Sequence, residues 1–156
     1  MMAKRIEGKQ VAKKGARFAV VVARTNSLVT ERLLSGCMDG LVRHGADEKA
    51  VDVVWVPGAY ELPLIVKALC EKKRHAAVIA IGCVIRGGTP HFEFIAAETS
   101  KGIAQASLDT GVPVAFGVLT CDSLEQALER AGAKAGNKGW EAALSALEMV
   151  DLVDQL

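Results

Sequence analysis

The chain has 156 residues, a formal net charge of +1 and 51% hydrophobic residues, with a low aromatic content. This length suits one domain with a substantial core, and the balanced charge argues against a nucleic-acid or membrane-surface protein. The sequence has no apolar run long enough to span a bilayer, and its basic N-terminus lacks the apolar segment of a signal peptide.

Apolar runs alternate with amphipathic stretches along the chain. We expect residues 1–15 to form a polar arm and residues 16–156 to form the domain. The expected elements are strand 17–23, helix 28–44, strand 51–56, helix 61–73, strand 76–85, helix 92–109, strand 112–120, a helix from 124, a glycine-bearing loop over 132–139 and a final helix from 140. Such alternation predicts a parallel sheet with helices on both faces and right-handed crossovers.

Residues 78–94 (VIAIGCVIRGGTPHFEF) combine a strand, a glycine-bearing turn and the start of a helix. In an open parallel sheet, ligands bind at the carboxyl ends of the strands. Free N–H groups at a helix start favour an anion, and His91 is able to transfer protons near neutral pH. A plain turn with an exposed histidine explains the same spacing equally well.

The four cysteines, Cys37, Cys70, Cys83 and Cys121, form no C-x-x-C pair, and each lies in or beside an apolar segment. Buried reduced thiols in a cytoplasmic protein are therefore expected rather than disulfides. The sequence has neither a Walker A loop nor a G-x-G-x-x-G fingerprint, and we expect neither a metal nor another cofactor. The loops at the strand ends suit proton transfers on a small polar, phosphorylated substrate.

Four motifs follow one another along the chain: ARTN (23–26), VPGAYELP (56–63), GCVIRGGTPHFEF (82–94) and GVLTCDSLEQALERAGAKAGNKGWEAA (117–143). In sequence and in order they resemble those of 6,7-dimethyl-8-ribityllumazine synthases. The resemblance implies a flavodoxin-like α/β/α fold with a four-stranded parallel sheet in the order 2-1-3-4. It also implies a cofactor-free condensation of two small molecules, 5-amino-6-(D-ribitylamino)uracil and 3,4-dihydroxy-2-butanone 4-phosphate, with release of phosphate and water.

The resemblance further implies roles for individual residues in the phosphate and proton chemistry. His91 matches the family's proton-transfer histidine, and Arg130 matches an arginine that clamps the phosphate from a neighbouring subunit. A guanidinium gives phosphate a planar, two-pronged donor. Gly88 and Thr89 match the phosphate-binding loop, and Lys138 matches a lysine near the phosphate.

The remaining matches concern contacts to the pyrimidine ring and the ribityl chain of the first substrate. The residues are Thr25, Asn26, Ala59, Tyr60, Glu61, Cys83, Val84, Ile85 and Phe116. The resemblance assigns Phe116, like Arg130, to the neighbouring subunit, so that each site would lie between two subunits.

Structural alternatives exist for four of these residues. Glu61 could be a first-turn acid favoured by the helix dipole, and Arg130 an exposed helix charge. Phe116 could be ordinary strand core, and Lys138 could donate to carbonyl groups of the loop at 132–139.

Thr25 departs from the family pattern, in which an aromatic residue after the arginine of the first loop stacks on the pyrimidine. Loss of this stack predicts pyrimidine binding weakened by about tenfold. Two rival functions remain: a shell-forming or lumazine-binding relative with little catalysis, and, from the fold alone, a flavin-binding module.

The resemblance also predicts how the subunits assemble. Members of the family form pentamers, and in many of them pentamers close into an icosahedral shell of sixty subunits. The compact GNKGWE junction (136–141) resembles members that form shells. We therefore expect the shell, with residues 1–12 able to add a strand to a neighbour's sheet.

Overall fold

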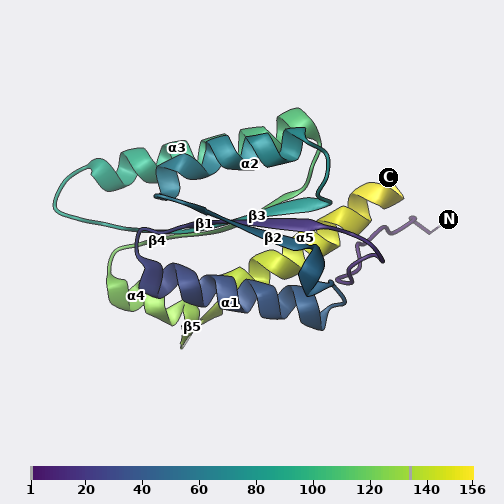
Figure 1. Ribbon diagram of the computed structural model, residues 1–156, viewed down its shortest axis with the longest axis horizontal. Helices are drawn as coiled ribbons and strands as arrows, with labels where there is room; N and C mark the ends of the chain where they lie inside the picture. Colours follow the sequence, from purple (N-terminus) through teal and green to yellow (C-terminus); the bar gives the residue numbers. More distant parts are fainter. Residues whose placement is uncertain (1, 134) are drawn as a thin grey trace.

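A four-stranded parallel sheet in the order β2-β1-β3-β4 forms the middle layer of the fold (Figure 1). It is seen in a computed structural model that describes residues 2–133 and 135–156. The strands are β1 (Phe18–Ala23), β2 (Val51–Val56), β3 (Ala77–Ile85) and β4 (Val114–Cys121). The strand order and the parallel pairing confirm the predicted flavodoxin-like sheet.

Helices cover both faces of this sheet (Figure 1). Two helices, α2 (Leu62–Glu71) and α3 (His91–Thr110), lie on one face. The other face carries α1 (Ser27–Arg43), the short α4 (Leu124–Glu129) and α5 (Lys138–Gln155). Two short 3-10 turns, η1 (Glu48–Ala50) and η2 (Ala59–Glu61), precede β2 and α2. In residues 2–133 and 135–156, no helix combines the length and apolarity needed to cross a membrane.

Alternation along the buried strands divides the core into two layers. In β1, Phe18, Val20 and Val22 join the cluster that includes side chains of α1 and α5. Ala19 and Val21 join the cluster on the α2 and α3 side. Because successive side chains point to opposite faces of a sheet, one uninterrupted apolar run fills both layers.

Two helix ends are determined by local backbone geometry and capping. Gly111 ends α3 with a φ of +73°, in the left-handed region that glycine adopts readily. Ser123 caps α4, because its Oγ accepts a hydrogen bond from the Gln126 backbone N–H at 3.1 Å. The Gln126 side chain returns to the N–H of Asp122, one residue earlier than in a standard capping box.

The prediction of a loop over 132–139 is wrong. Ala131–Ala133 (β5) and Gly136–Asn137 (β6) pair as a short antiparallel hairpin, and α5 begins at Lys138. Asn137 caps α5 by accepting from the Trp140 N–H at 3.0 Å. Small residues and glycines hide this hairpin in the sequence, because they show neither β-branched side chains nor alternation.

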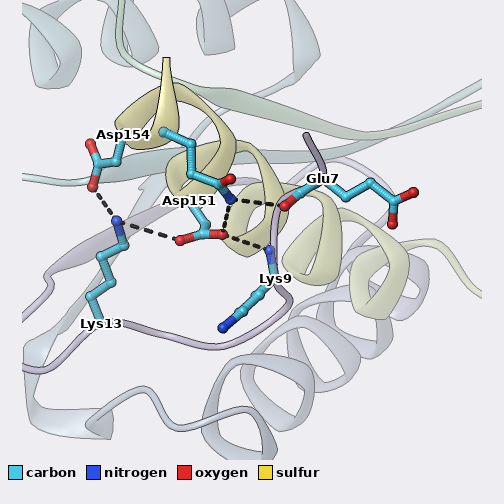
Figure 2. A network of polar contacts seen from close by, with 6 residues as sticks. Glu7, Lys9, Lys13, Asp151 and Asp154 are labelled. Carbon is cyan, nitrogen blue, oxygen red and sulfur yellow. Dashed lines mark hydrogen bonds and ion pairs between the residues drawn. The ribbon is translucent and has the colours of Figure 1, made fainter. Parts of the chain in front are cut away.

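The N-terminal arm runs along the last turns of α5 (Figure 2). The Lys9 backbone N–H donates to Asp151 Oδ2 at 2.8 Å. The Lys13 ammonium pairs with Asp154 and lies 3.6 Å from Asp151 Oδ1. Asp151 therefore holds the arm at two points, and the Lys9 N–H is the main cause that keeps the pKa of its carboxyl below the usual range.

Close backbone packing also attaches the arm to α5. A Cβ at Gly8 would lie 2.1 Å from the Glu148 carbonyl oxygen, so only glycine allows this approach. Farther along, the Ala12 N–H donates to the His44 carbonyl at 2.8 Å. By contrast, Met2 and Ile6 are exposed.

We expect Asp151→Ala to release the arm without unfolding the domain. Trypsin should then cleave after Lys9 and Lys13 about fivefold to tenfold faster, because both attachments to Asp151 are lost. Mass spectrometry of timed digests measures this rate, and Asp109→Ala on α3 is the control. Acid should also release the arm. The pKa of Asp151 is lowered in the folded protein, so its attachment to the arm is present at neutral pH and weakens as the pH falls through this lowered pKa. Unchanged cleavage in Asp151→Ala would contradict this account of the arm.

Candidate functional site

A pocket of about 460 Å³ opens at the carboxyl ends of β1 and β3. These neighbouring strands form the switch point of the sheet, since the chain leaves β1 towards β2 on one side and β3 towards β4 on the other. Ligands bind at such a point in open α/β sheets. The pocket, called here the histidine pocket, is lined by Thr25, Asn26, Gly58, Ala59, Tyr60, Glu61, Cys83, Val84, Ile85, His91 and Ile95.

The loop after β1 ties together the strand ends that surround the pocket. The Asn26 side-chain amide donates to the Cys83 carbonyl at 2.8 Å. Asn26 also precedes α1 with a φ of +60°, a conformation that asparagine tolerates better than most residues. The Thr25 hydroxyl donates to the Pro57 carbonyl at 3.0 Å, and the Thr25 N–H donates to the same oxygen. Thr25 is therefore engaged with the neighbouring loop.

The turn after β2 brings a carboxylate and an aromatic ring to the same pocket. Its 3-10 geometry is closed by the Glu61 N–H, which donates to the Gly58 carbonyl at 3.2 Å. The Thr99 hydroxyl of α3 donates to the Ala59 carbonyl at 3.2 Å, which fixes the turn to the helix behind it. Tyr60 remains 62% exposed. Glu61 thus offers acceptor oxygens for hydroxyl groups of a ligand.

Cys83 supplies the pocket with an unreactive thiol. Burial is the main cause that raises its pKa to about 12, so the thiol is neutral at physiological pH. A thiolate is the nucleophilic form of cysteine. Cys83 can therefore contact a ligand without attacking it. All four cysteines are free and buried, as expected for reduced thiols.

His91 is the first residue of α3, and the glycine-bearing turn precedes it. The Thr89 hydroxyl accepts a hydrogen bond from the His91 N–H at 3.4 Å. Gly88 and Thr89 are exposed, and a Cβ on Gly88 would meet only open space. The turn therefore leaves room for an anion to approach the free N–H groups at the helix start.

Three further predicted residues line a second pocket, of about 250 Å³, on the edge strand β4. This pocket, called here the arginine pocket, is lined by Phe116, Val118, Leu119, Thr120, Cys121, Arg130 and Lys138. Among the residues that the structure describes, its lining shares none with the histidine pocket. Twelve of the fourteen predicted site residues of one chain are thus divided between two separate pockets, and the other two, Gly88 and Thr89, lie in the turn before α3 and line neither.

The β5–β6 hairpin brings the two cations of the arginine pocket together. The Lys138 N–H donates to the Arg130 carbonyl at 2.9 Å, and an Arg130 side-chain nitrogen donates to the Gln126 carbonyl at 3.1 Å. Phe116 is 46% exposed, so its interpretation as ordinary strand core is wrong. A pocket with one guanidinium and one ammonium is suited to an anionic ligand.

Sequence reasoning missed several lining residues. Ile95 lies four positions after His91, and this spacing on α3 could have identified it, because residues i and i+4 share a helix face. Gly58 belongs to the quoted VPGAYELP stretch, and a Cβ there would lie 3.2 Å from the Thr25 hydroxyl. Leu119 and Thr120 line the arginine pocket because β4 is an edge strand, and no local sequence pattern reveals that position. In the described residues, no group of three His, Cys, Asp or Glu side chains is arranged to hold a metal.

The chain is similar to a known family and to a curated protein. A family model described as 6,7-dimethyl-8-ribityllumazine synthase matches residues 15–154. A protein of that name from Syntrophus aciditrophicus (strain SB) is 59% identical over 150 residues, which cover 96% of this chain and 97% of the relative.

Proposed function

Because the chain belongs to the 6,7-dimethyl-8-ribityllumazine synthase family, it condenses 5-amino-6-(D-ribitylamino)uracil with 3,4-dihydroxy-2-butanone 4-phosphate, and we propose that it does so in a site shared by two subunits. The observation that carries this proposal is the division of the predicted residues between two pockets. A histidine pocket on one subunit, the loop of Gly88 and Thr89 beside it, and an arginine pocket on the next subunit would together supply the predicted contacts.

The histidine pocket would take the uracil substrate. The backbone N–H and C=O groups of Cys83, Val84 and Ile85, at the end of β3, are suited to hydrogen bonds with the edge of the pyrimidine ring. Glu61 can accept hydrogen bonds from the ribityl hydroxyls. Tyr60, Ala59 and the side chain of Asn26 lie around the same cavity. Phe116 from the neighbouring subunit would close its open side with an exposed aromatic ring.

The phosphate would lie at the boundary of the two subunits. Gly88 and Thr89 offer the loop before α3, while Arg130 and Lys138 offer cations from the neighbour. A bidentate guanidinium binds phosphate strongly and fixes its orientation. The two substrates would therefore be held with the ketone of one next to the amine of the other.

The reaction needs little beyond this placement and one proton carrier. The uracil amine attacks the ketone and gives an imine with loss of water. Phosphate then leaves by elimination, the enol tautomerises, and ring closure releases a second water. His91 would move the protons from its place at the start of α3. Holding two reactants together supplies much of the rate.

A coupled assay tests the function directly. The two substrates are mixed with the protein, and phosphate release is followed together with lumazine absorbance. Both signals should rise in a one-to-one ratio. Tight lumazine or flavin binding without turnover would instead favour a binding relative with little catalysis, a possibility that Thr25 raises.

Thr25→Trp is expected to tighten uracil binding by about threefold to tenfold, because an aromatic stack is restored. Isothermal titration with the uracil substrate measures the change. The substitution also removes the Thr25–Pro57 hydrogen bond, so Thr25→Val serves as the matched control that loses only the hydroxyl. A flat or weaker affinity for the tryptophan variant, relative to the valine variant, would show that the pocket compensates elsewhere.

The two-subunit site requires an oligomer, which we propose to be a pentamer that closes further into a sixty-subunit shell. Large exposed apolar side chains on the α2 and α3 side, Leu64, Phe94 and Leu108, favour extensive burial between copies. β2 is an edge strand with exposed Val53 and Trp55, so the free end of a neighbour's arm would complete it. Light scattering distinguishes these assemblies.

Free, reduced cysteines are typical of proteins that function in the cytoplasm, and we propose this location for the enzyme.

A further inference from the structure

Arg86 lies outside both pockets, yet it connects the elements that carry their functional residues. It follows β3 directly and begins the loop that leads through Gly88 and Thr89 to His91. Its backbone N–H donates to the Cys121 carbonyl at the end of β4 at 2.8 Å. Arg86 is therefore anchored at the point where the phosphate-binding loop leaves the sheet.

The Arg86 side chain makes three further contacts. Its Nε donates to Asp122 Oδ1 at 2.9 Å, just after β4. One terminal nitrogen pairs with Glu93 in the first turn of α3. The guanidinium carbon lies 4.4 Å from the centre of the Phe92 ring, in a cation–π arrangement. One side chain thus joins both ends of the loop to the neighbouring strand.

These contacts argue against a direct role for Arg86 in phosphate binding. Its donors already face two carboxylates, and its flat face covers Phe92. The Asp122 and Glu93 hydrogen bonds raise the pKa of Arg86, and the Arg86 hydrogen bond lowers that of Glu93. The positive charge of Arg86 is therefore already paired with the Asp122 and Glu93 carboxylates and is not free to neutralise a ligand.

We propose that Arg86 is a positioning residue for the phosphate of the butanone substrate. It acts in two ways through the loop at 86–91. It fixes the loop between β3 and α3, so that the substrate need not order it. It also neutralises Glu93, whose carboxylate otherwise competes with an anion for the positive end of α3. This inference rests on the proposed function of Gly88 and Thr89.

Arg86→Gln should therefore impair one substrate selectively. We expect the KM for the butanone phosphate to rise about tenfold, which corresponds to the cost of ordering about one residue of the loop. The KM for the uracil substrate should stay within about twofold, because Arg86 does not line the histidine pocket. Calorimetry with inorganic phosphate should show an affinity about tenfold weaker than that of the unmodified protein.

Two variants separate positioning from general structural support. Arg86→Lys keeps the positive charge but loses the planar, two-pronged donor geometry of the guanidinium. Its phosphate affinity should lie between those of Arg86→Gln and the parent protein. Arg43→Gln is the matched control, because Arg43 Nε also donates to a carboxylate, Asp39 Oδ1, at 2.8 Å on the surface of α1. It should alter neither KM, and all three variants should melt within a few degrees of the parent.

Three results would overturn the role of Arg86. The first is unchanged phosphate affinity in Arg86→Gln, measured by calorimetry whether or not the protein turns over. The second is an equal rise in both KM values, and the third is a large fall in melting temperature, each of which indicates support of the fold alone. Failure of the parent protein to release phosphate in the coupled assay would reject the proposed function separately.

Discussion

Arg130→Ala should raise the KM for the butanone phosphate by about a hundredfold or more. Removal of one partner from a close charged pair costs about 2–5 kcal/mol, and each 1.4 kcal/mol is a factor of ten. Arg130 is suited to this role because the end of α4 and the β5–β6 hairpin hold it beside Lys138. Steady-state kinetics at saturating uracil substrate measures the effect.

Arg130→Lys separates charge from geometry in the same assay. Lysine keeps a cation but loses the planar fork, so we expect a rise in KM of about tenfold. Arg43→Ala, on the surface of α1, removes an arginine from a different ion pair and should leave the KM unchanged. If Arg130→Ala kept the parent KM, Arg130 would not be a phosphate ligand.

His91→Ala should lower kcat by about a hundredfold without abolishing turnover. Proton transfer by one positioned side chain contributes about 10²–10⁴-fold, whereas the placement of the two substrates survives the substitution. Rates at saturation with both substrates measure kcat, and added imidazole should restore part of it. An unchanged kcat would remove His91 from the mechanism.

His44 provides a matched control for that variant. Its ring packs edge-on against Trp140 at 5.5 Å, and Nδ1 lies 2.7 Å from the Gly40 carbonyl. His44→Ala should therefore lower the melting temperature by a few degrees through lost packing. Its kcat should match that of the parent protein, and imidazole should have no effect.

The sheet and its helices were predictable because their signals are local. The buried runs at 17–23 and 76–85 and the alternation with amphipathic helices determine a parallel sheet. Gly111 and Ser123 mark helix ends through backbone conformation and capping. The pairing of β5 (Ala131–Ala133) with β6 (Gly136–Asn137) was missed, because glycine and alanine carry almost no strand signal.

Most residues that line the two pockets were named from the sequence, but only through motif resemblance, and their roles stay predictions. Spacing alone left His91 as either a functional or an ordinary turn residue. The link from Arg86 to Asp122 and Glu93 joins residues of three elements, and only the folded chain brings them together. The separation of Arg130 from His91 likewise follows from the edge position of β4, which is a property of strand order.

Restoration of activity in mixed assemblies tests the shared site most directly. The His91→Ala and Arg130→Ala chains carry different tags and are co-expressed in equal amounts. The mixed assemblies are then purified through both tags. If each site combines His91 of one subunit with Arg130 of the next, about a quarter of the sites should have both residues, and about a quarter of the parent activity should return. Activity no higher than that of the separate variants would show that each subunit carries its own complete site.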